Sequence, residues 1–132
     1  MPPKVPPDDL LPNPTDSELA ILQILWRRGP SSVREIWKEL GEKSGYTTVL
    51  KFLQIMFEKR LVRRDDRQQT HIYEAAAAKT KTQERLMTGV IDRVFGGSTG
   101  ELVLRALSAK KVSDEELSAI RALLAEEEKK RK

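Results

Sequence analysis

The stretch that decides the fold is residues 31–74, SSVREIWKELGEKSGYTTVLKFLQIMFEKRLVRRDDRQQTHIYE. Near its start, Ser32 is followed three residues later by Glu35, which is the capping-box spacing that begins a helix. Gly41 ends this short helix, because glycine readily adopts the backbone geometry that closes a helix. Over residues 44–59 the apolar side chains recur with the helical period, which predicts a second and longer helix.

A β-hairpin is expected directly after the longer helix. The segments 61–64 and 70–74 are short and rich in β-prone residues, and the polar turn 65–69 separates them. Before the stretch, the capping-box spacing recurs at Thr15–Glu18 and predicts a helix that ends at Gly29. Three short helices followed by a basic hairpin are typical of the winged helix-turn-helix, in which one helix fits the major groove of DNA.

Three further helices are expected after the hairpin. Their starts carry the same spacing at Thr80–Gln83, Ser98–Glu101 and Ser113–Glu116. Each helix is strongly apolar on one side, and we expect two copies of the chain to pack through these sides as a homodimer. The alternative is that the helices fold back on the winged domain of the same chain. The residues expected at the dimer interface are Leu86, Val90, Val94, Phe95, Leu102, Val103, Leu107, Leu117, Ile120 and Leu124.

The expected fold class is therefore mainly α with a small β-hairpin. It combines a winged helix-turn-helix domain with a C-terminal helical dimerisation region. We expect a disordered leader over residues 1–14, the DNA-binding domain over residues 15–78 and the dimerisation region over residues 79–132. Six of the seven prolines lie in the leader, where they prevent a helix or a central strand.

Composition excludes several classes of function. The chain has no cysteine and one histidine, His71, so disulfides, thiolate metal sites and multi-histidine metal sites are excluded. There is no glycine-rich phosphate loop and no Ser/His/Asp spacing, so we expect no catalytic residue, no cofactor and no enzyme activity. No apolar run approaches the roughly 18 residues of a membrane helix, and no signal-peptide core is present. A cytoplasmic protein without membrane insertion is expected.

Basic charge is concentrated in the longer helix and the hairpin. Residues 43–71 carry seven basic and three acidic side chains, a net charge of +4, whereas residues 1–78 together carry only +1. Because phosphate neutralisation is local, this concentration favours a double-stranded DNA partner. The alternatives are a solvated surface, or a winged-helix protein-interaction module that does not bind DNA.

Several stretches of the chain resemble the penicillinase-repressor and methicillin-resistance-regulator family of winged-helix transcriptional repressors. They are Thr15–Leu25, Val33–Leu40, Tyr46–Leu53, Glu58–Val62, His71–Tyr73, Phe95–Ser98 and Leu102–Leu124. The resemblance implies a sequence-specific repressor that binds a dyad-symmetric operator as a homodimer, with Tyr46–Lys59 as its recognition helix. The candidate DNA contacts are Ser32, Arg34, Tyr46, Thr47, Thr48, Lys51, Arg64 and Arg67. A helix cap is the alternative role for Thr47 or Thr48.

Three positions depart from the family pattern. Many relatives carry a polar residue where this chain has Leu50. Arg60 stands where the family has a glycine that ends the recognition helix, so either backbone strain or another cap geometry is expected there. The resemblance also implies release by proteolysis, downstream of a membrane sensor-protease, and the Asn-Phe bond cut in relatives aligns with Arg105-Ala106. The cysteines of the copper-responsive branch are missing.

Overall fold

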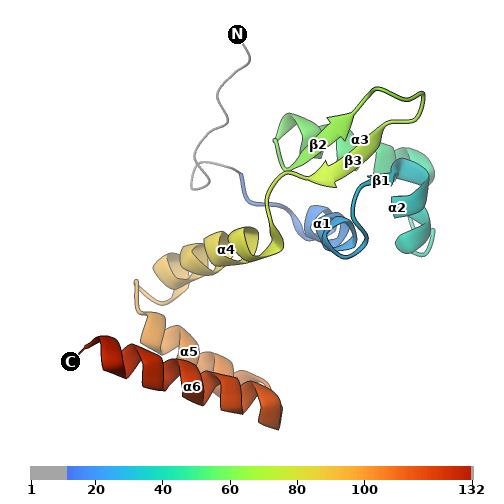
Figure 1. Ribbon diagram of the computed structural model, residues 1–132. Helices are drawn as coiled ribbons and strands as arrows, with labels where there is room; N and C mark the ends of the chain where they lie inside the picture. The colour runs from blue at the N-terminus through green and yellow to red at the C-terminus, as the bar shows by residue number, and fades with distance from the viewer. Residues whose placement is uncertain (1–11, 132) are drawn as a thin grey trace. The chain divides into compact units, whose positions relative to one another are not determined.

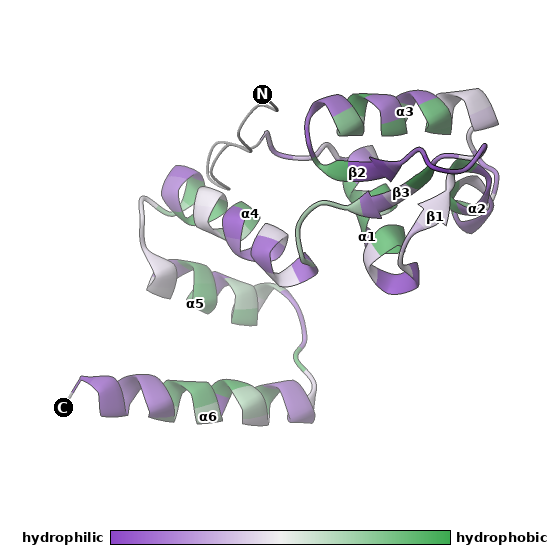
Figure 2. Cartoon of the chain, turned by 45° about the horizontal axis from the view of Figure 1, so that its top comes forward, coloured by the Kyte–Doolittle hydropathy of each residue, from purple (hydrophilic) through white to green (hydrophobic). Residues whose placement is uncertain are grey.

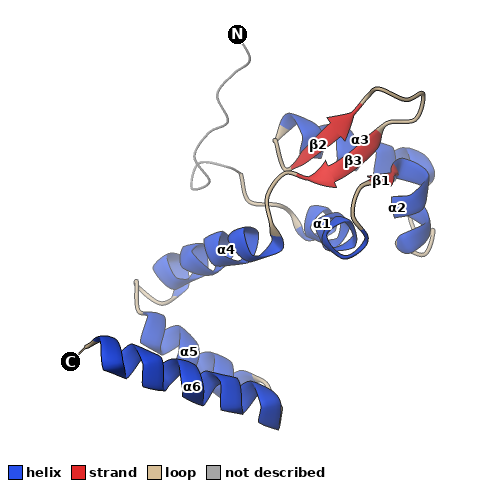
Figure 3. Cartoon of the chain, viewed as in Figure 1, coloured by secondary structure: helices blue, strands red, loops and turns tan. Residues whose placement is uncertain are grey.

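A computed structural model of the chain describes residues 12–131 (Figures 1 and 3). The elements are α1 (Asp16–Arg28), β1 (Ser31–Ser32), α2 (Val33–Glu39), α3 (Tyr46–Glu58), β2 (Val62–Asp65), β3 (Ile72–Ala75), α4 (Lys79–Val94), α5 (Thr99–Ala109) and α6 (Asp114–Lys130). This order confirms the prediction of a mainly helical winged helix-turn-helix followed by C-terminal helices. Most of the expected leader lies outside the described residues.

The chain separates into two compact units. The first ends at Thr88 and the second begins at Gly89, so the division falls inside α4. The first unit contains the winged helix, and the second contains the last turns of α4 together with α5 and α6.

The core of the first unit lies between α1, α2, α3 and the sheet. Every one of these elements contributes fully buried apolar side chains, because the helices place apolar residues three and four positions apart on one face. The most buried are Ile21 and Leu22 from α1, Ile36 from α2, Val49, Leu53 and Met56 from α3, and Val62 and Tyr73 from the strands. Figure 2 shows the apolar residues of these helices in green.

The sheet has three strands rather than the two of the expected hairpin. Its order is β1-β3-β2, and both pairings are antiparallel. β1 consists of Ser31 and Ser32, which lie opposite Tyr73 and Ile72 of β3. Two residues are too few to produce the alternation of apolar and polar side chains that predicts a strand, so β1 was not predicted.

The helix starts follow the capping boxes in most cases. Thr15, Ser32 and Ser113 each form the reciprocal capping box with the glutamate three residues later. Ser98 caps α5 by accepting a hydrogen bond from the Glu101 N–H. The prediction for Thr80 was wrong, because α4 already begins at Lys79 and Thr80 lies in its first turn.

Left-handed backbone closes both helices of the helix-turn-helix. Gly41 and Glu42 have φ values of 78° and 58° after α2, and Arg60 has a φ of 66° after α3. A side chain in this region crowds the following carbonyl, which costs roughly 1–2 kcal/mol. The strain expected at Arg60 from the missing glycine is therefore present.

Candidate nucleic-acid interface

α3 presents a polar face to solvent. Val49, Leu53 and Met56 of α3 are buried in the core of the first unit. Thr47 and Lys51 lie on the opposite side of the helix and are exposed. Lys51 forms no ion pair with any residue between 12 and 131, so its ammonium group is available to an external anion.

The start of α3 has no side-chain cap. Gly45 occupies the N-cap position and provides no side-chain hydrogen bond to the first turn. Thr47 and Thr48 lie inside the helix and are exposed, so the alternative role of either threonine as the N-cap is wrong. Among residues 12–131 their side chains have no hydrogen-bond partner, so they can make the contacts of threonine with phosphates and thymine methyl groups.

An aromatic cluster fixes the turn between α2 and α3. The Trp37 indole N–H donates to the Ser44 carbonyl at 2.7 Å. The rings of Trp37 and Tyr46 meet edge to face with centroids 6.0 Å apart. The Arg34 guanidinium lies 5.8 Å from the centre of the Tyr46 ring. The structure thus brings the candidate contacts Arg34 and Tyr46 together beside the start of α3.

Ser32 differs from the other candidates because it is almost buried. Its hydroxyl accepts a hydrogen bond from the Glu35 N–H at 3.2 Å, and its backbone N–H donates to the Glu35 carboxylate. Ser32 is also part of β1. The Ser32 hydroxyl therefore caps α2, and its hydrogen and second lone pair remain for a further contact.

The loop between β2 and β3, which forms the wing, extends toward the end of the unit where α3 begins (Figures 1 and 2). Arg64 lies at the base of this loop. Its guanidinium stacks on the Phe57 ring at 4.2 Å, and its Nε donates to Asp66 at 2.7 Å. Phe57 of α3 is 38% exposed, and the face of its ring carries this arginine.

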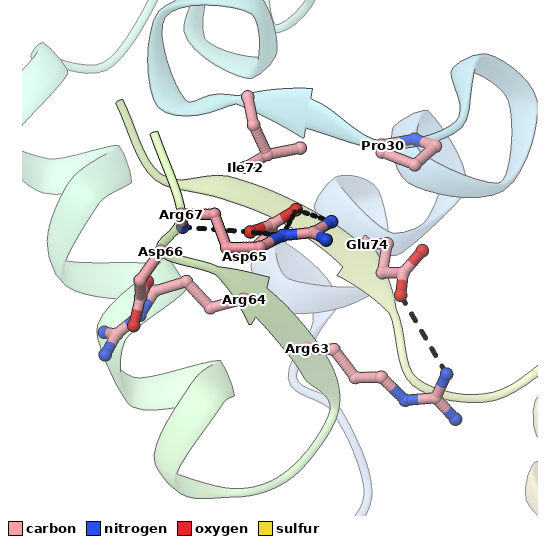
Figure 4. Close-up of a pocket in the computed structure, with 8 residues that line it drawn as sticks. All are labelled: Pro30, Arg63, Arg64, Asp65, Asp66, Arg67, Ile72 and Glu74. Atoms are coloured by element: carbon pink, nitrogen blue, oxygen red, sulfur yellow. Dashed lines mark hydrogen bonds and ion pairs between the residues drawn. The ribbon is translucent and has the colours of Figure 1, made fainter. Parts of the chain in front are cut away.

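Arg67 lies on the other side of the hairpin from Arg64 (Figure 4). Its side chain is 89% exposed, but its guanidinium makes a two-pronged contact with Asp65 at 2.8 Å and 3.0 Å. Hydrogen bonds from the Arg67 side chain and backbone N–H lower the pKa of Asp65 to about 2. Both groups therefore remain charged throughout the physiological pH range.

Lys59 points inward, although it contributes to the basic charge of the sequence. Its ammonium group donates to both oxygens of Glu18 at 3.0 Å and 3.1 Å, and the Glu18 side chain is only 2% exposed. Burial alone would raise the pKa of Glu18, but the hydrogen bond from the Thr15 N–H and the contact with Lys59 outweigh it, and the pKa is lowered. This pair joins the start of α1 to the end of α3.

Internal ion pairs reduce the basic surplus of residues 43–71. Four of the seven cationic side chains are paired with carboxylates: Lys59 with Glu18, Arg63 with Glu74, Arg64 with Asp66 and Arg67 with Asp65. These carboxylate partners were not predicted from the sequence. The two aspartates one and two residues from Arg64 and Arg67 were a usable signal, whereas Glu18 is 41 residues from Lys59 and gave none.

The second unit has almost no interior. Among residues 89–131, Ile91 is the one buried apolar side chain, and neither α5 nor α6 contains a buried residue. The expected interface residues Val94, Val103, Leu107 and Leu124 are exposed. The other six, Leu86, Val90, Phe95, Leu102, Leu117 and Ile120, are half-buried. Leu104 and Leu123, which were not among the expected interface residues, are 57% and 62% exposed.

The Arg105-Ala106 bond lies within α5, and both residues are exposed. Arg105 pairs with Glu101 one turn earlier at 3.8 Å. Within the described part of the chain, no helix is long and apolar enough to cross a membrane. Residues 12–131 also contain no group of three or more His, Cys, Asp or Glu side chains that could hold a metal ion.

Known proteins resemble the chain over nearly its whole length. The family model described as penicillinase repressor matches residues 14–126. The penicillinase repressor of Bacillus licheniformis is 21% identical over 124 residues, which cover 92% of the chain and 97% of that protein. The family match begins before α1 and ends within α6, so it includes both compact units.

Proposed function

The chain belongs to the penicillinase repressor family, and on that premise we propose that it is a repressor that binds duplex DNA in a sequence-specific manner. In this proposal it acts as a homodimer on a dyad-symmetric operator. The observation that carries the proposal is the exposed polar face of α3, on a helix whose opposite face is buried in the core; on that face Lys51 has no ion pair within the described part of the chain. A rigid helix of this kind fits the major groove.

The proposed contacts fall into two groups. Thr47, Thr48 and Lys51 at the start of α3 would reach base edges and the nearest phosphates. Arg34 and Tyr46 are in contact at the start of α3. Ser32 is the N-cap of α2, two residues before Arg34. These side chains would contact the DNA backbone and set the angle of the recognition helix. Arg64 and Arg67 in the wing would contact phosphates outside the groove.

The proposed dimer rests on the exposed apolar side chains of the second unit. Burial of each Leu, Val or Ile contributes roughly 1.5–3 kcal/mol, and several such side chains offset the entropy lost on association. Three helices with one buried apolar residue among them lack a core of their own. A second copy of the chain would supply it. Two-fold symmetry would then place two recognition helices about 34–36 Å apart, one turn of DNA.

Release by proteolysis is part of the proposal. A protease needs an extended segment, so α5 must open locally before the Arg105-Ala106 bond is cut. Opening is inexpensive in a helix with few buried contacts, and α5 has no buried residue. Cutting there would separate α6 from the rest of the dimerisation region and weaken operator binding. A membrane sensor-protease pathway is the proposed source of the signal.

A second candidate function is a protein-interaction module. The internal pairing of four cations in residues 43–71 favours it, because paired arginines contribute less to DNA binding. The two functions differ in their response to salt. For DNA binding, the logarithm of the affinity falls linearly with the logarithm of the salt concentration, and each phosphate contacted adds about 0.9 to the steepness of that line. Binding through apolar contacts has no such slope.

The test is selection of bound fragments from the genomic DNA of the organism that encodes the chain, followed by salt titration on the selected sequence. We expect fragments that share a palindrome and a steep log-linear loss of affinity. Lys51→Ala should weaken binding, whereas Lys111→Ala, the same charge change in the exposed loop before α6, should not. No enrichment of any sequence, or equal effects of the two variants, would overturn the proposal.

A further inference from the structure

Asp65 holds Arg67 by two means. The Arg67 side chain donates from Nη2 to Asp65 at 2.8 Å and from Nε at 3.0 Å and 3.2 Å. The Arg67 backbone N–H donates to the same carboxylate at 3.0 Å. One carboxylate therefore shapes the turn of the wing and also occupies the guanidinium that the wing would present to DNA.

The contact that Asp65 makes is the contact that a DNA phosphate would make. Arginine binds carboxylates and phosphates in the same way, with two parallel N–H donors facing two oxygens. The donors of Arg67 that face Asp65 are therefore not available to a phosphate at the same time. Accepting this contact with DNA requires the guanidinium to leave the carboxylate.

We propose that Asp65 is an internal competitor of DNA phosphate for Arg67, and that it weakens sequence-independent binding by the wing. The proposal rests on the DNA-binding function proposed above. In the free protein the Asp65 carboxylate occupies the position of a phosphate, and Arg67 exchanges one anion for the other when the wing meets a duplex.

The neighbouring pair shows why the competition concerns Arg67 rather than Arg64. The Arg64 guanidinium is held by the Phe57 ring as well as by Asp66, and its side chain is only 25% exposed. Arg67 has no ring contact among the described residues and is bound to its own loop by Asp65 alone. Its side chain is long and exposed, so it can turn away from Asp65 without disturbing the core.

The exchange leaves a signature in the salt dependence of binding. A phosphate contact by an unpaired arginine releases counterions and adds about 0.9 to the slope of log affinity against log salt. When Arg67 must first leave Asp65, the carboxylate becomes exposed and takes up a cation in turn. The two ion effects oppose each other, so Arg67 contributes little to the slope while Asp65 is charged.

The experiment measures binding of the full-length chain to a mixed-sequence duplex by fluorescence anisotropy over a range of salt concentrations. Asp65→Asn removes the charge but keeps an oxygen that accepts the Arg67 backbone N–H, so the turn is retained. Glu74→Gln is the matched control, because it makes the same charge change on β3 beside Arg63, which lies 3.9 Å away. Arg67→Ala is made alone and combined with Asp65→Asn, and thermal unfolding verifies that each variant folds.

We expect Asp65→Asn to raise affinity roughly tenfold, the scale of one charged hydrogen bond, and to steepen the slope by about 0.9. When Arg67 is alanine, the gain from Asp65→Asn should fall to the small gain that Glu74→Gln gives by removing one negative charge. Equal gains from Asp65→Asn and Glu74→Gln, or a gain from Asp65→Asn that is as large without Arg67 as with it, would overturn the competition while leaving DNA binding intact. If the unmodified chain binds no duplex, the proposed function fails, and the competition fails with it.

Discussion

Replacing Lys59 by methionine should destabilise the first unit, because it leaves the buried Glu18 carboxylate without its counter-ion. Removing one partner of a fully buried pair costs about 3–5 kcal/mol. The Lys59 side chain is 31% exposed, so water screens part of this pair. Glu18 also keeps the hydrogen bond from the Thr15 N–H at 2.9 Å. We therefore expect the free energy of unfolding to fall by about 2–3 kcal/mol.

The loss should depend on pH in a defined direction. The pKa of Glu18 is lowered in the folded protein, so its pairing stabilises the fold above the ordinary value of 4.5 and is lost as the pH falls through the folded value. Without Lys59, burial acts to raise the pKa of the Glu18 carboxyl group. In acid the group is then protonated, and the variant no longer holds an uncompensated buried charge. The stability difference between the two proteins should be largest near neutral pH and should narrow in acid.

Urea unfolding followed by far-UV circular dichroism, at one fixed protein concentration and at two pH values near 7 and near 4, measures both effects. Lys38→Met is the control, because Lys38 is exposed on α2 and forms no ion pair with residues 12–131. It should change the free energy of unfolding by less than about 0.5 kcal/mol. Equal effects of the two substitutions, or a difference that stays constant in acid, would refute the role assigned to the pair.

The other predictions concern binding, assembly and backbone strain. Lys51→Ala should weaken binding to the selected operator by about 1–3 kcal/mol without changing the circular dichroism spectrum, and unchanged affinity would remove Lys51 from the interface. Leu107→Asp should give single chains in sedimentation equilibrium, because it introduces a charge into the proposed apolar dimer interface. A retained dimer would show that Leu107 lies outside that interface. Arg60→Gly should raise the free energy of unfolding by about 1 kcal/mol, because it relieves a φ of 66°, and an unchanged urea midpoint would count against strain at this position.

Local patterns in the sequence predicted most of the fold. The capping boxes at Thr15, Ser32 and Ser113 are contacts within four residues, so the sequence alone contains all of their parts. The helical period of the apolar residues predicts the buried face of α3, and the polar residues between them form the opposite face. The exception at Thr80 shows the limit of such patterns. With Thr80 as the cap the helix would begin at Lys81, and α4 begins two residues earlier, at Lys79.

Contacts between distant residues could not be predicted in this way. β1 is defined only by its pairing with β3, some forty residues later, and the Glu18–Lys59 pair depends on how α1 and α3 cross. The net charge of residues 43–71 likewise could not reveal which cations are paired in the folded chain. It counts Lys59, Arg64 and Arg67 as available cations, whereas their availability depends on carboxylates that only the folded chain brings within reach.

The near-absence of an interior in residues 89–131 has a consequence for how the molecule melts. If a second copy supplies the missing contacts, folding of this part obeys mass action, and its melting temperature rises with protein concentration. The winged unit has its own core and should melt at a temperature that dilution leaves unchanged. Below the concentration at which the dimer dissociates, the helices of residues 89–131 would unfold and become substrates for general proteases. Copy number would then control the lifetime of the chain as well as how often it occupies DNA.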